Sequence, residues 1–373
     1  MATSKEWTDQ YNPFNSAKLM AQIPKWRKII RGEEIPAPTL VTIDPINSCN
    51  YGCTWCNAEY ILDKNTGKIG DSTLEEIADY LPKWGVDAVC IAGGGEPLIH
   101  PYLGKLVGKL AEGNVKSGIV TNGLYLDRHM DYLNNCTWVG VSMDCASQET
   151  LEKLKKAKQG DFDRTIKGIE KLASLGGTLG GPGQGHGVSY KYLLHPGNVS
   201  EVYEAAKIAR ETGCRNLHIR PFGTPWDQVG QKPKDTFSIG DLEEFNDQIE
   251  RARELETDTF KVFGITHKFD GNFRKQNEFD TCHAIFMTGV FMPPQSSEGK
   301  YSFGLCCDRR GDEGLTLPDL TSTSQVTDFW GSEEHWKMFD KIKPENCPRC
   351  TYQPHNQIFE KAVEEDNMTV DFI

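Results

Sequence analysis

Three cysteines within eight residues constrain this chain more than any other feature of its sequence: Cys49, Cys53 and Cys56, with the spacing C-x3-C-x2-C. A tight turn of this kind can present three thiolates to one face of an iron–sulfur cluster. Four cysteines cap such a cluster fully, so three cysteines from one loop leave one iron open to an outside ligand. An open position is what metal sites use for chemistry. A zinc knuckle and a chance grouping are the alternatives that the spacing alone leaves open.

Composition is typical of a globular protein. The 373 residues are 38% hydrophobic and 25% charged, and their number predicts two or three domains. No apolar run approaches the roughly 18 residues of a membrane span, and the first residues lack the apolar core of a secretory signal. We therefore expect a cytoplasmic protein with no membrane partner. The net charge of −12 argues against a nucleic-acid partner that is held by its phosphates.

Cysteine usage indicates metal binding. Twelve cysteines in a chain without an export signal favour metal over disulfides. Most of them fall into two groups, one at 49–56 and one between 282 and 350. The others stand alone and are expected to be small buried hydrophobic residues. They are Cys90, Cys136, Cys145 and Cys214.

An alternation of strands and helices begins after Pro38. Capping-box sequences at 72–75 and 198–201 predict two of the helix starts. Six strands that alternate with helices predict an α/β fold, a parallel sheet curled into a partial (β/α)6 barrel of the TIM type. Active sites of such barrels lie at the C-terminal ends of the strands, and the cysteine loop follows the first of them. The predicted strands are 39–43, 87–92, 117–121, 138–142, 188–194 and 216–220, with helices near 101–112, 147–157, 161–175 and 198–213.

The alternation is expected to stop after Phe222. A polar stretch with one charged helix near 241–255 follows, and from about 277 the sequence changes to short runs, turns and cysteines. The predicted regions are an N-terminal extension (1–37), the partial barrel (38–225), a linker with a helix (226–276) and a small C-terminal α+β domain (277–373).

A second motif follows the second predicted strand, at Gly93-Gly94-Gly95-Glu96-Pro97. Glycines at a strand end let the backbone approach a ligand closely, and a carboxylate there can receive an ammonium group. On its own the motif is equally compatible with a turn. Placed some forty residues after the cysteine loop, it completes a pair that resembles the signature of the radical S-adenosylmethionine (SAM) superfamily. The resemblance covers about residues 38–225.

The resemblance implies the cofactors. In this superfamily the three cysteines, here Cys49, Cys53 and Cys56, hold a [4Fe-4S] cluster, and the amino and carboxylate groups of SAM bind its free iron. One electron from the cluster cleaves SAM to methionine and a 5′-deoxyadenosyl radical, which takes a hydrogen atom from the substrate. The expected contacts of the SAM ammonium group are Gly94, Gly95 and Glu96.

Further residues match positions near SAM in the superfamily. Trp55 is the aromatic residue expected near the adenine, and a shield for the cluster is its other interpretation. Ser142, at the end of the fourth strand, is expected to contact SAM, with a plain strand-end serine as the alternative. Asn122, at the end of the third strand, faces the same edge, and its alternative is a turn residue.

Two residues are candidates for a base that faces the substrate. Asp144 follows the fourth strand beside the predicted SAM site. His186 lies in the glycine-rich segment 175–187, which lacks the ending of a phosphate loop. We expect this segment to be a surface connection, with a flap over the substrate as the alternative.

The second group of cysteines does not have the spacing of a compact zinc finger. It resembles the C-terminal twitch extension of SPASM/twitch radical SAM enzymes, in which one cysteine precedes a β-hairpin, one follows it and a C-x2-C pair comes last. The resemblance implies one auxiliary [4Fe-4S] cluster, fully capped and suited to electron transfer. Cys306 is preferred over Cys307 because the family's ligand usually comes first after the hairpin. The expected ligands are Cys282, Cys306, Cys347 and Cys350, and a structural zinc at the same residues is the alternative.

These features predict a radical SAM oxidoreductase of the dehydrogenase type. The radical removes a substrate hydrogen, a base removes a proton, and an electron passes to the auxiliary cluster. The substrate is a small molecule or a peptide, and flavodoxin or ferredoxin is the expected electron partner. The alternatives are an epimerase or a C–C or C–S bond-forming maturase of a ribosomal peptide, and a SAM-binding iron–sulfur regulatory protein that is not an enzyme.

Overall fold

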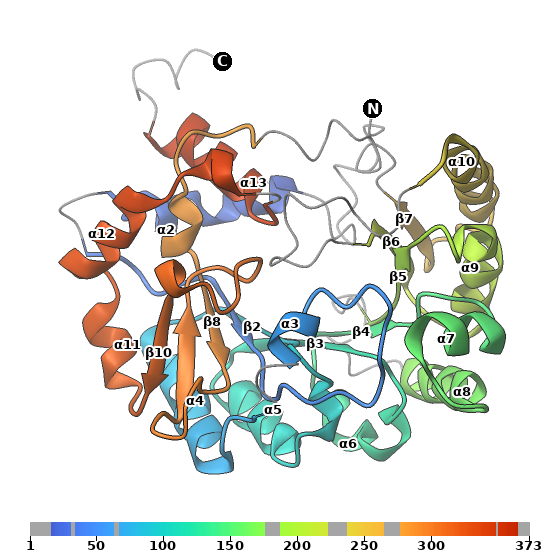
Figure 1. Cartoon of the computed structure of the whole chain (residues 1–373), viewed down its shortest axis with the longest axis horizontal. Coiled ribbons are helices and arrows are strands. Elements are labelled where there is room, and N and C mark those ends of the chain that lie inside the picture. The colour runs from blue at the N-terminus through green and yellow to red at the C-terminus, as the bar shows by residue number, and fades with distance from the viewer. Residues whose placement is uncertain are drawn as a thin grey trace.

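The computed structural model describes residues 16–30, 34–62, 67–175, 187–222, 237–264, 277–347 and 350–364. One sheet organises these residues, with ten strands in the order β10-β9-β8-β1-β2-β3-β4-β5-β6-β7. Helices α5 to α9 lie along the lower and right-hand rim of the sheet in Figure 1, and the C-terminal helices α11 and α12 lie on the left.

The first six strands run parallel in chain order, each paired with the next. This order, with helices on the connections, confirms the α/β class and the partial (β/α)6 barrel. The strands are β1 (Leu40–Ile43), β2 (Ala88–Ile91), β3 (Lys116–Thr121), β4 (Trp138–Ser142), β5 (Gly187–Leu194) and β6 (Asn216–Pro221).

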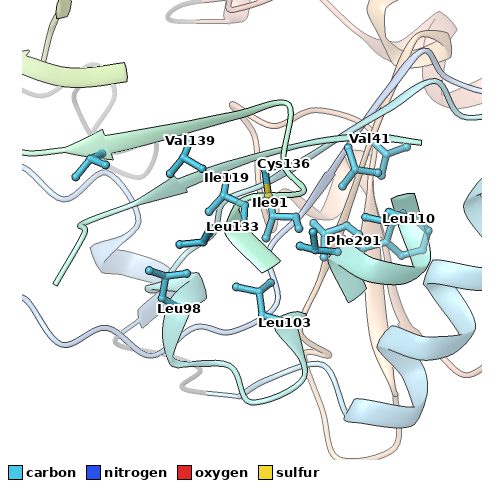
Figure 2. Close-up of a cluster of buried hydrophobic side chains, with 14 of the residues drawn as sticks. Val41, Ile91, Leu98, Leu103, Leu110, Ile119, Leu133, Cys136, Val139 and Phe291 are labelled. Atoms are coloured by element: carbon cyan, nitrogen blue, oxygen red, sulfur yellow. The ribbon is translucent and has the colours of Figure 1, made fainter. Parts of the chain in front are cut away.

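The core lies between these strands and the helices outside them. Figure 2 shows a part of it, where Ile91 of β2 and Ile119 of β3 gather with Leu103 and Leu110 of α5, all of them buried. Because side chains alternate along a strand, the residues between these positions face the barrel interior. The helices are α4 (Asp71–Trp84), α5 (Leu103–Glu112), α6 (Met130–Leu133), α7 (Gln148–Lys155), α8 (Asp161–Ser174) and α9 (Val202–Glu211).

The two predicted capping boxes are wrong. Helix α4 begins at Asp71 after Gly70, and no side chain caps it. The Asn198 side chain instead binds strand-end backbone, with its Oδ1 accepting from His195 N at 2.8 Å. Glu201 accepts from the N-terminal residues of α7, including Ser147 Oγ at 2.6 Å. In both places a different arrangement of hydrogen bonds outweighs the local capping pattern.

The expectation that the alternation stops after Phe222 is also wrong. Helix α10 (Ile239–Arg253) packs beside α9, and β7 (Lys261–Gly264) adds a parallel strand to β6. Part of the predicted linker therefore extends the barrel sheet. The short strand has only four residues and ends in a glycine, so periodicity gives little signal for it. A capping box between Ser238 and Asp241 begins α10.

The C-terminal region contains the predicted hairpin, but its strands do not form a separate sheet. β8 (Thr288–Met292) pairs in parallel with β1, and β9 (Tyr301–Gly304) and β10 (Thr316–Leu320) follow antiparallel. A pairing between strands almost 250 residues apart leaves no local trace in the sequence. The helices of this region are α11 (Ser324–Phe329), α12 (Glu333–Lys341) and α13 (Gln353–Phe359).

The N-terminal segment packs on this C-terminal region. Trp26 is buried, with its ring 5.6 Å from that of His355 in α13. None of the helices in the described residues combines the length and hydrophobicity that a membrane crossing requires. Short helical segments complete these residues: η1 (Ser16–Gln22), α2 (Ile23–Trp26), α3 (Glu59–Leu62), η2 (Pro97–Ile99), η3 (Leu126–Arg128), η4 (Val199–Glu201), η7 (His283–Phe286), η8 (Glu313–Leu315), η9 (Pro344–Asn346) and η10 (Glu360–Glu364).

Candidate functional site

The cysteine loop lies at the C-terminal end of β1 and is held by backbone hydrogen bonds to α7. Gly52 N donates to Lys155 O at 3.0 Å, and Thr54 N donates to Leu154 O at 2.9 Å. Within the loop, Cys56 N donates to Cys53 O at 3.1 Å. Cys49 is exposed and the other two thiols are partly exposed. The loop thus fixes three thiols in a turn that stays open on one side.

The chemistry of these thiols fits a positively charged metal group. Burial raises the pKa of Cys53 to about 12, and burial also raises the pKa of Cys49. Lys155 lowers both pKa values and the neighbouring thiols raise them, so one ammonium group is the positive charge that acts on both thiols, and three thiolates at this turn require more. Bound metal ions supply such charge and deprotonate the thiols that bind them. Cys49, Cys53 and Cys56 therefore fit a [4Fe-4S] cluster.

The glycine motif packs directly against the segment that leads into the cysteine loop. Gly95 N donates to Ile46 O at 3.0 Å, and Glu96 N donates to Ser48 O at 2.9 Å. A Cβ on Gly95 would come within 2.0 Å of Ser48 O, and one on Gly94 within 2.6 Å of Asn47 Oδ1. These glycines are thus required by contact between two loops. Their contact with the SAM ammonium stays a prediction.

Glu96 ties the end of β2 to the end of β3. It is 3% exposed, and its carboxylate accepts from Thr121 Oγ1 at 2.6 Å, from Asn122 N at 2.7 Å and from Leu98 N at 2.9 Å. Burial raises the pKa of Glu96, and these hydrogen bonds oppose that rise. A carboxylate has about four lone-pair positions, so one further donor can bind. That leaves room for the predicted ammonium contact.

Asn122 joins three of the predicted site segments. Its Nδ2 donates to Oδ1 of Asn50 in the cysteine loop at 2.8 Å, and its own N donates to Glu96. Its Oδ1 accepts from Leu124 N at 3.1 Å, which also makes it a turn residue. The two interpretations of Asn122 are compatible.

Asp144 is part of a buried ion pair. Its Oδ2 accepts from Lys155 Nζ at 2.9 Å and its Oδ1 from Leu193 N at 2.7 Å, and both charged side chains are at most 3% exposed. Its φ of 59° lies in the left-handed region, which aspartate tolerates better than most residues. With both oxygens engaged, Asp144 is better suited to hold α7 against the strand ends than to take a substrate proton.

Lys155 is a site residue that sequence analysis missed. Its Nζ also donates to the carbonyl oxygen of Ser142, and its backbone oxygen holds Gly52. Burial lowers the pKa of Lys155, but Asp144 and then Cys53 raise it by more, so the ammonium form is favoured. One lysine among many at the end of a charged helix carries no signal that it is buried. Ser142 itself is partly exposed at the end of β4.

Trp55 lies in an aromatic cluster beside the cysteine loop. It is 7% exposed, with its ring 5.1 Å from that of His195, which in turn lies 4.9 Å from Phe222. This packing accounts for the burial of Trp55, and both interpretations of its role stay predictions. His186 lies outside the described residues.

The second group of cysteines divides between two cavities. Cys282, Cys306, Cys347 and Cys350 line one cavity, whose walls are mostly apolar and include Phe279, Ile285 and Leu315. Cys307 lines another, together with Asn57, Tyr60 and Arg310. The structure thus places Cys306, rather than its neighbour, with the other three predicted ligands.

The four thiols line this cavity together and are partly buried. Burial raises the pKa of Cys282 to about 11, and burial raises that of Cys350 as well, with neighbouring thiols adding to both. Among the described residues, no three His, Cys, Asp or Glu side chains are close enough together to hold one metal ion. Zinc requires every sulfur at about 2.3 Å from one atom. A [4Fe-4S] cluster binds each thiolate through a different iron, and four thiols around one cavity can supply its four ligands.

Comparison with known proteins agrees with this geometry. Residues 43–197 match the model of the radical SAM superfamily. The mycofactocin maturase MftC of Mycobacterium tuberculosis is 26% identical over 202 residues, which are 52% of this chain and 48% of that protein. The probable GTP 3′,8-cyclase of Methanocaldococcus jannaschii is 30% identical over 171 residues, 45% of this chain and 54% of that protein. The chain thus spans about half the length of these curated relatives.

A solved structure shares the fold. Streptococcus suis SuiB bound to the precursor peptide SuiA has a TM-score of 0.59 and 17% identity, over 96% of this chain and 80% of that one. At this identity the likeness shows the fold alone. The chain contains a radical SAM domain, which confirms the superfamily predicted from its motifs. SAM and a [4Fe-4S] cluster are the cofactors of this superfamily, as predicted.

Proposed function

We propose that this protein is a radical SAM oxidoreductase that passes an electron from its substrate to an auxiliary cluster. The observation that carries the proposal is the separate cavity lined by Cys282, Cys306, Cys347 and Cys350. Four thiols cap every iron of a [4Fe-4S] cluster, which leaves electron transfer as its role. A reaction without net oxidation has no need of such an acceptor.

The residues of the barrel edge have distinct tasks in this scheme. When bound to Cys49, Cys53 and Cys56, the first cluster supplies, with SAM, a radical that removes a substrate hydrogen atom. Glu96 orients the SAM ammonium group, and the 93–97 backbone supports it. Trp55 and its aromatic neighbours keep water from the cluster. Asp144 and His186 were the predicted bases; the ion pair of Asp144 argues against its use as a base.

For the substrate we propose a peptide, with a small molecule as the second candidate. The peptide is supported by the fold likeness to SuiB, which was solved with a precursor peptide. The small molecule is supported by the 30% identity to a probable GTP 3′,8-cyclase. Flavodoxin or ferredoxin is the proposed electron partner. Epimerisation and bond formation are the alternatives. The number of electrons delivered to the electron partner per product molecule separates them from oxidation, because only a net oxidation of the substrate reduces that partner.

The test is anaerobic reconstitution followed by reduction with dithionite. We expect about eight iron atoms per chain, four for each cluster, and formation of 5′-deoxyadenosine from SAM. The double variant Cys347→Ala/Cys350→Ala is expected to lose half of the iron and still form 5′-deoxyadenosine. Cys307→Ala is the matched control and keeps all of the iron. A wild-type chain that binds iron and SAM without forming 5′-deoxyadenosine would support a regulatory protein instead.

A further inference from the structure

The inner face of the barrel sheet carries polar side chains that solvent reaches. On β5, Tyr190 and Tyr192 are fully buried against the outer helices, whereas Lys191 between them points inward and stays partly exposed. The same alternation leaves Cys90 of β2 and Ser142 of β4 partly exposed. Because β5 pairs with β4 in the register Ser142–Lys191, the lysine lies beside the predicted SAM-binding edge.

The ammonium group of Lys191 lies beside two aromatic rings. Its Nζ lies 5.4 Å from the centre of the Trp138 ring and 3.5 Å from Nδ1 of His218. Throughout the described residues, no carboxylate is within ion-pair distance of it. Asp144, two residues after the end of β4, acts on it electrostatically, but that carboxylate is bound by Lys155. Enclosing an ammonium group without a carboxylate partner costs free energy, even where the side chain stays partly exposed as Lys191 does.

The carboxylates that act on Lys191 and on its neighbour Cys90 are paired with other cations. Arg220 of β6 acts on Lys191 directly, and the Cys90 thiol lies within electrostatic reach of Lys191, Arg220 and Arg310. Asp44 approaches from β1, but it is paired with Arg310 through an Nη2–Oδ1 contact of 3.2 Å. Asp144 is thus engaged by Lys155 and Asp44 by Arg310, and Lys191 is left without a carboxylate partner among the described residues. Concentrated charge of one sign in a concave site attracts ligands of the opposite sign.

The sheet provides room for the lysine side chain. A Cβ on Gly140, the β4 residue on the same face, would come within 2.1 Å of Lys191 Cε. A side chain at position 140 would therefore displace the lysine stem from its present path. The lysine path depends on a glycine in the adjacent strand.

We propose that Lys191 binds a carboxylate or phosphate group of the substrate inside the barrel. The proposal rests on the proposed function, because it takes the barrel interior as the reaction chamber. It narrows the substrate to one with an anionic group near the reacting carbon, such as a peptide with an acidic side chain or free C-terminus, or a phosphorylated small molecule. SAM also has a carboxylate, so the experiment must separate the two sources.

The protonation state of Lys191 sets the pH range of binding. Burial and then Arg220 lower the pKa of Lys191 to about 8. The cation that attracts an anion is therefore present below about pH 8 and lost above it. Anion binding should weaken as the pH rises through this value, whereas an ordinary lysine would keep its charge to about pH 10.4.

Anion binding at Lys191 can be measured by competitive acetylation with isotope-coded acetic anhydride, in which mass spectrometry reads the extent of labelling of each lysine. The reconstituted holoenzyme is labelled at pH 7.5 with and without saturating SAM. In each case labelling in phosphate or in succinate is compared with labelling in sodium chloride of the same ionic strength. We expect both anions to slow labelling of Lys191 several-fold with SAM bound, and to leave the exposed Lys105 of α5 unchanged. Protection should fade above pH 8.

Two results would overturn the proposal. One is labelling of Lys191 that neither anion slows. The other is protection by SAM alone with no further effect of the anions, which would assign the lysine to the SAM carboxylate. As a second measurement, phosphate should raise the melting temperature of wild type and of Lys191→Arg, but not of Lys191→Met. Absence of 5′-deoxyadenosine with protection intact would instead count against the proposed function alone.

Discussion

The two groups of thiols are held in place by different means. Backbone hydrogen bonds from α7 and close glycine contacts position the three-thiol loop at 49–56. The four-thiol cavity is instead held by hydrogen bonds between side chains and the backbone of segments far apart in the sequence. Asn277 Nδ2 donates to Pro344 O at 2.6 Å, and Asp308 Oδ2 accepts from Thr351 N at 2.7 Å. The loop is thus built into the barrel, whereas the cavity depends on polar contacts between segments. A substitution that disturbs the loop should therefore destabilise the whole fold, whereas one that disturbs the cavity should affect only the auxiliary cluster.

The largest expected effect separates the chemistry of the two groups. Cys53→Ala should abolish 5′-deoxyadenosine formation, because it removes a ligand of the cluster that binds SAM. Cys282→Ala should leave that formation intact and remove the auxiliary iron. Product chromatography and iron analysis of anaerobic protein measure both. If Cys282→Ala also abolished SAM cleavage in a folded protein, the division of roles between the groups would be wrong.

The next effect concerns the anchor of the three-thiol loop. Lys155→Met should destabilise the fold by about 3–5 kcal/mol, because it leaves Asp144 as a buried charge without its partner. Urea unfolding of the anaerobic protein gives the free energy. Lys207→Met breaks an exposed pair with Glu204 and should leave the free energy of unfolding nearly unchanged, because solvent screens that pair. Equal losses in the two variants would show that the buried pair is not the anchor.

A third change tests the glycine contact. Gly95→Ala should cost about 3 kcal/mol, since its Cβ would meet Ser48 backbone, which cannot move without the cysteine loop. Cluster loading of the loop should fall with it. Gly108 of α5 has open space around its Cβ position, so Gly108→Ala should stabilise by up to about 1 kcal/mol. A neutral Gly95→Ala would mean that the loop is less tightly fixed than its contacts indicate.

Sequence analysis was strongest where local pattern and function coincide. The six barrel strands and the cysteine loop rest on periodicity and spacing, and the structure has the strands within about two residues of their predicted ends. The preference for Cys306 rests instead on the family resemblance. Sequence analysis failed where residues far apart in the chain determine the structure. The parallel pairing of β8 with β1 and the burial of Lys155 depend on tertiary contacts, which no window of sequence contains.

The smallest expected effect concerns the polar contacts that hold the four-thiol cavity. Asn356 of α13 is fully buried; its Oδ1 accepts from Ala284 N at 2.8 Å, and its buried Nδ2 has no hydrogen-bond partner among the described residues. The Asn356 side chain lowers the pKa of the Cys282 thiol, so this amide is placed to donate to the sulfur of a bound cluster. Asn356→Ala should cost about 1–2 kcal/mol. Hydrogen bonds to ligand sulfurs tune the reduction potential of a cluster, so the auxiliary potential should also become more negative.

The neighbouring Gln357 gives the matched control for this change. Its Nε2 donates to Glu278 Oε2 at 3.0 Å in an exposed contact, so Gln357→Ala should alter neither stability nor potential. Potentiometric titration followed by electron paramagnetic resonance separates the two clusters. If the cavity is maintained by such polar contacts, only the auxiliary signal should respond to Asn356→Ala. A shift in the signal of the three-thiol cluster would mean that the two regions are coupled, and the Arg310–Asp44 pair between them is then the contact to test next.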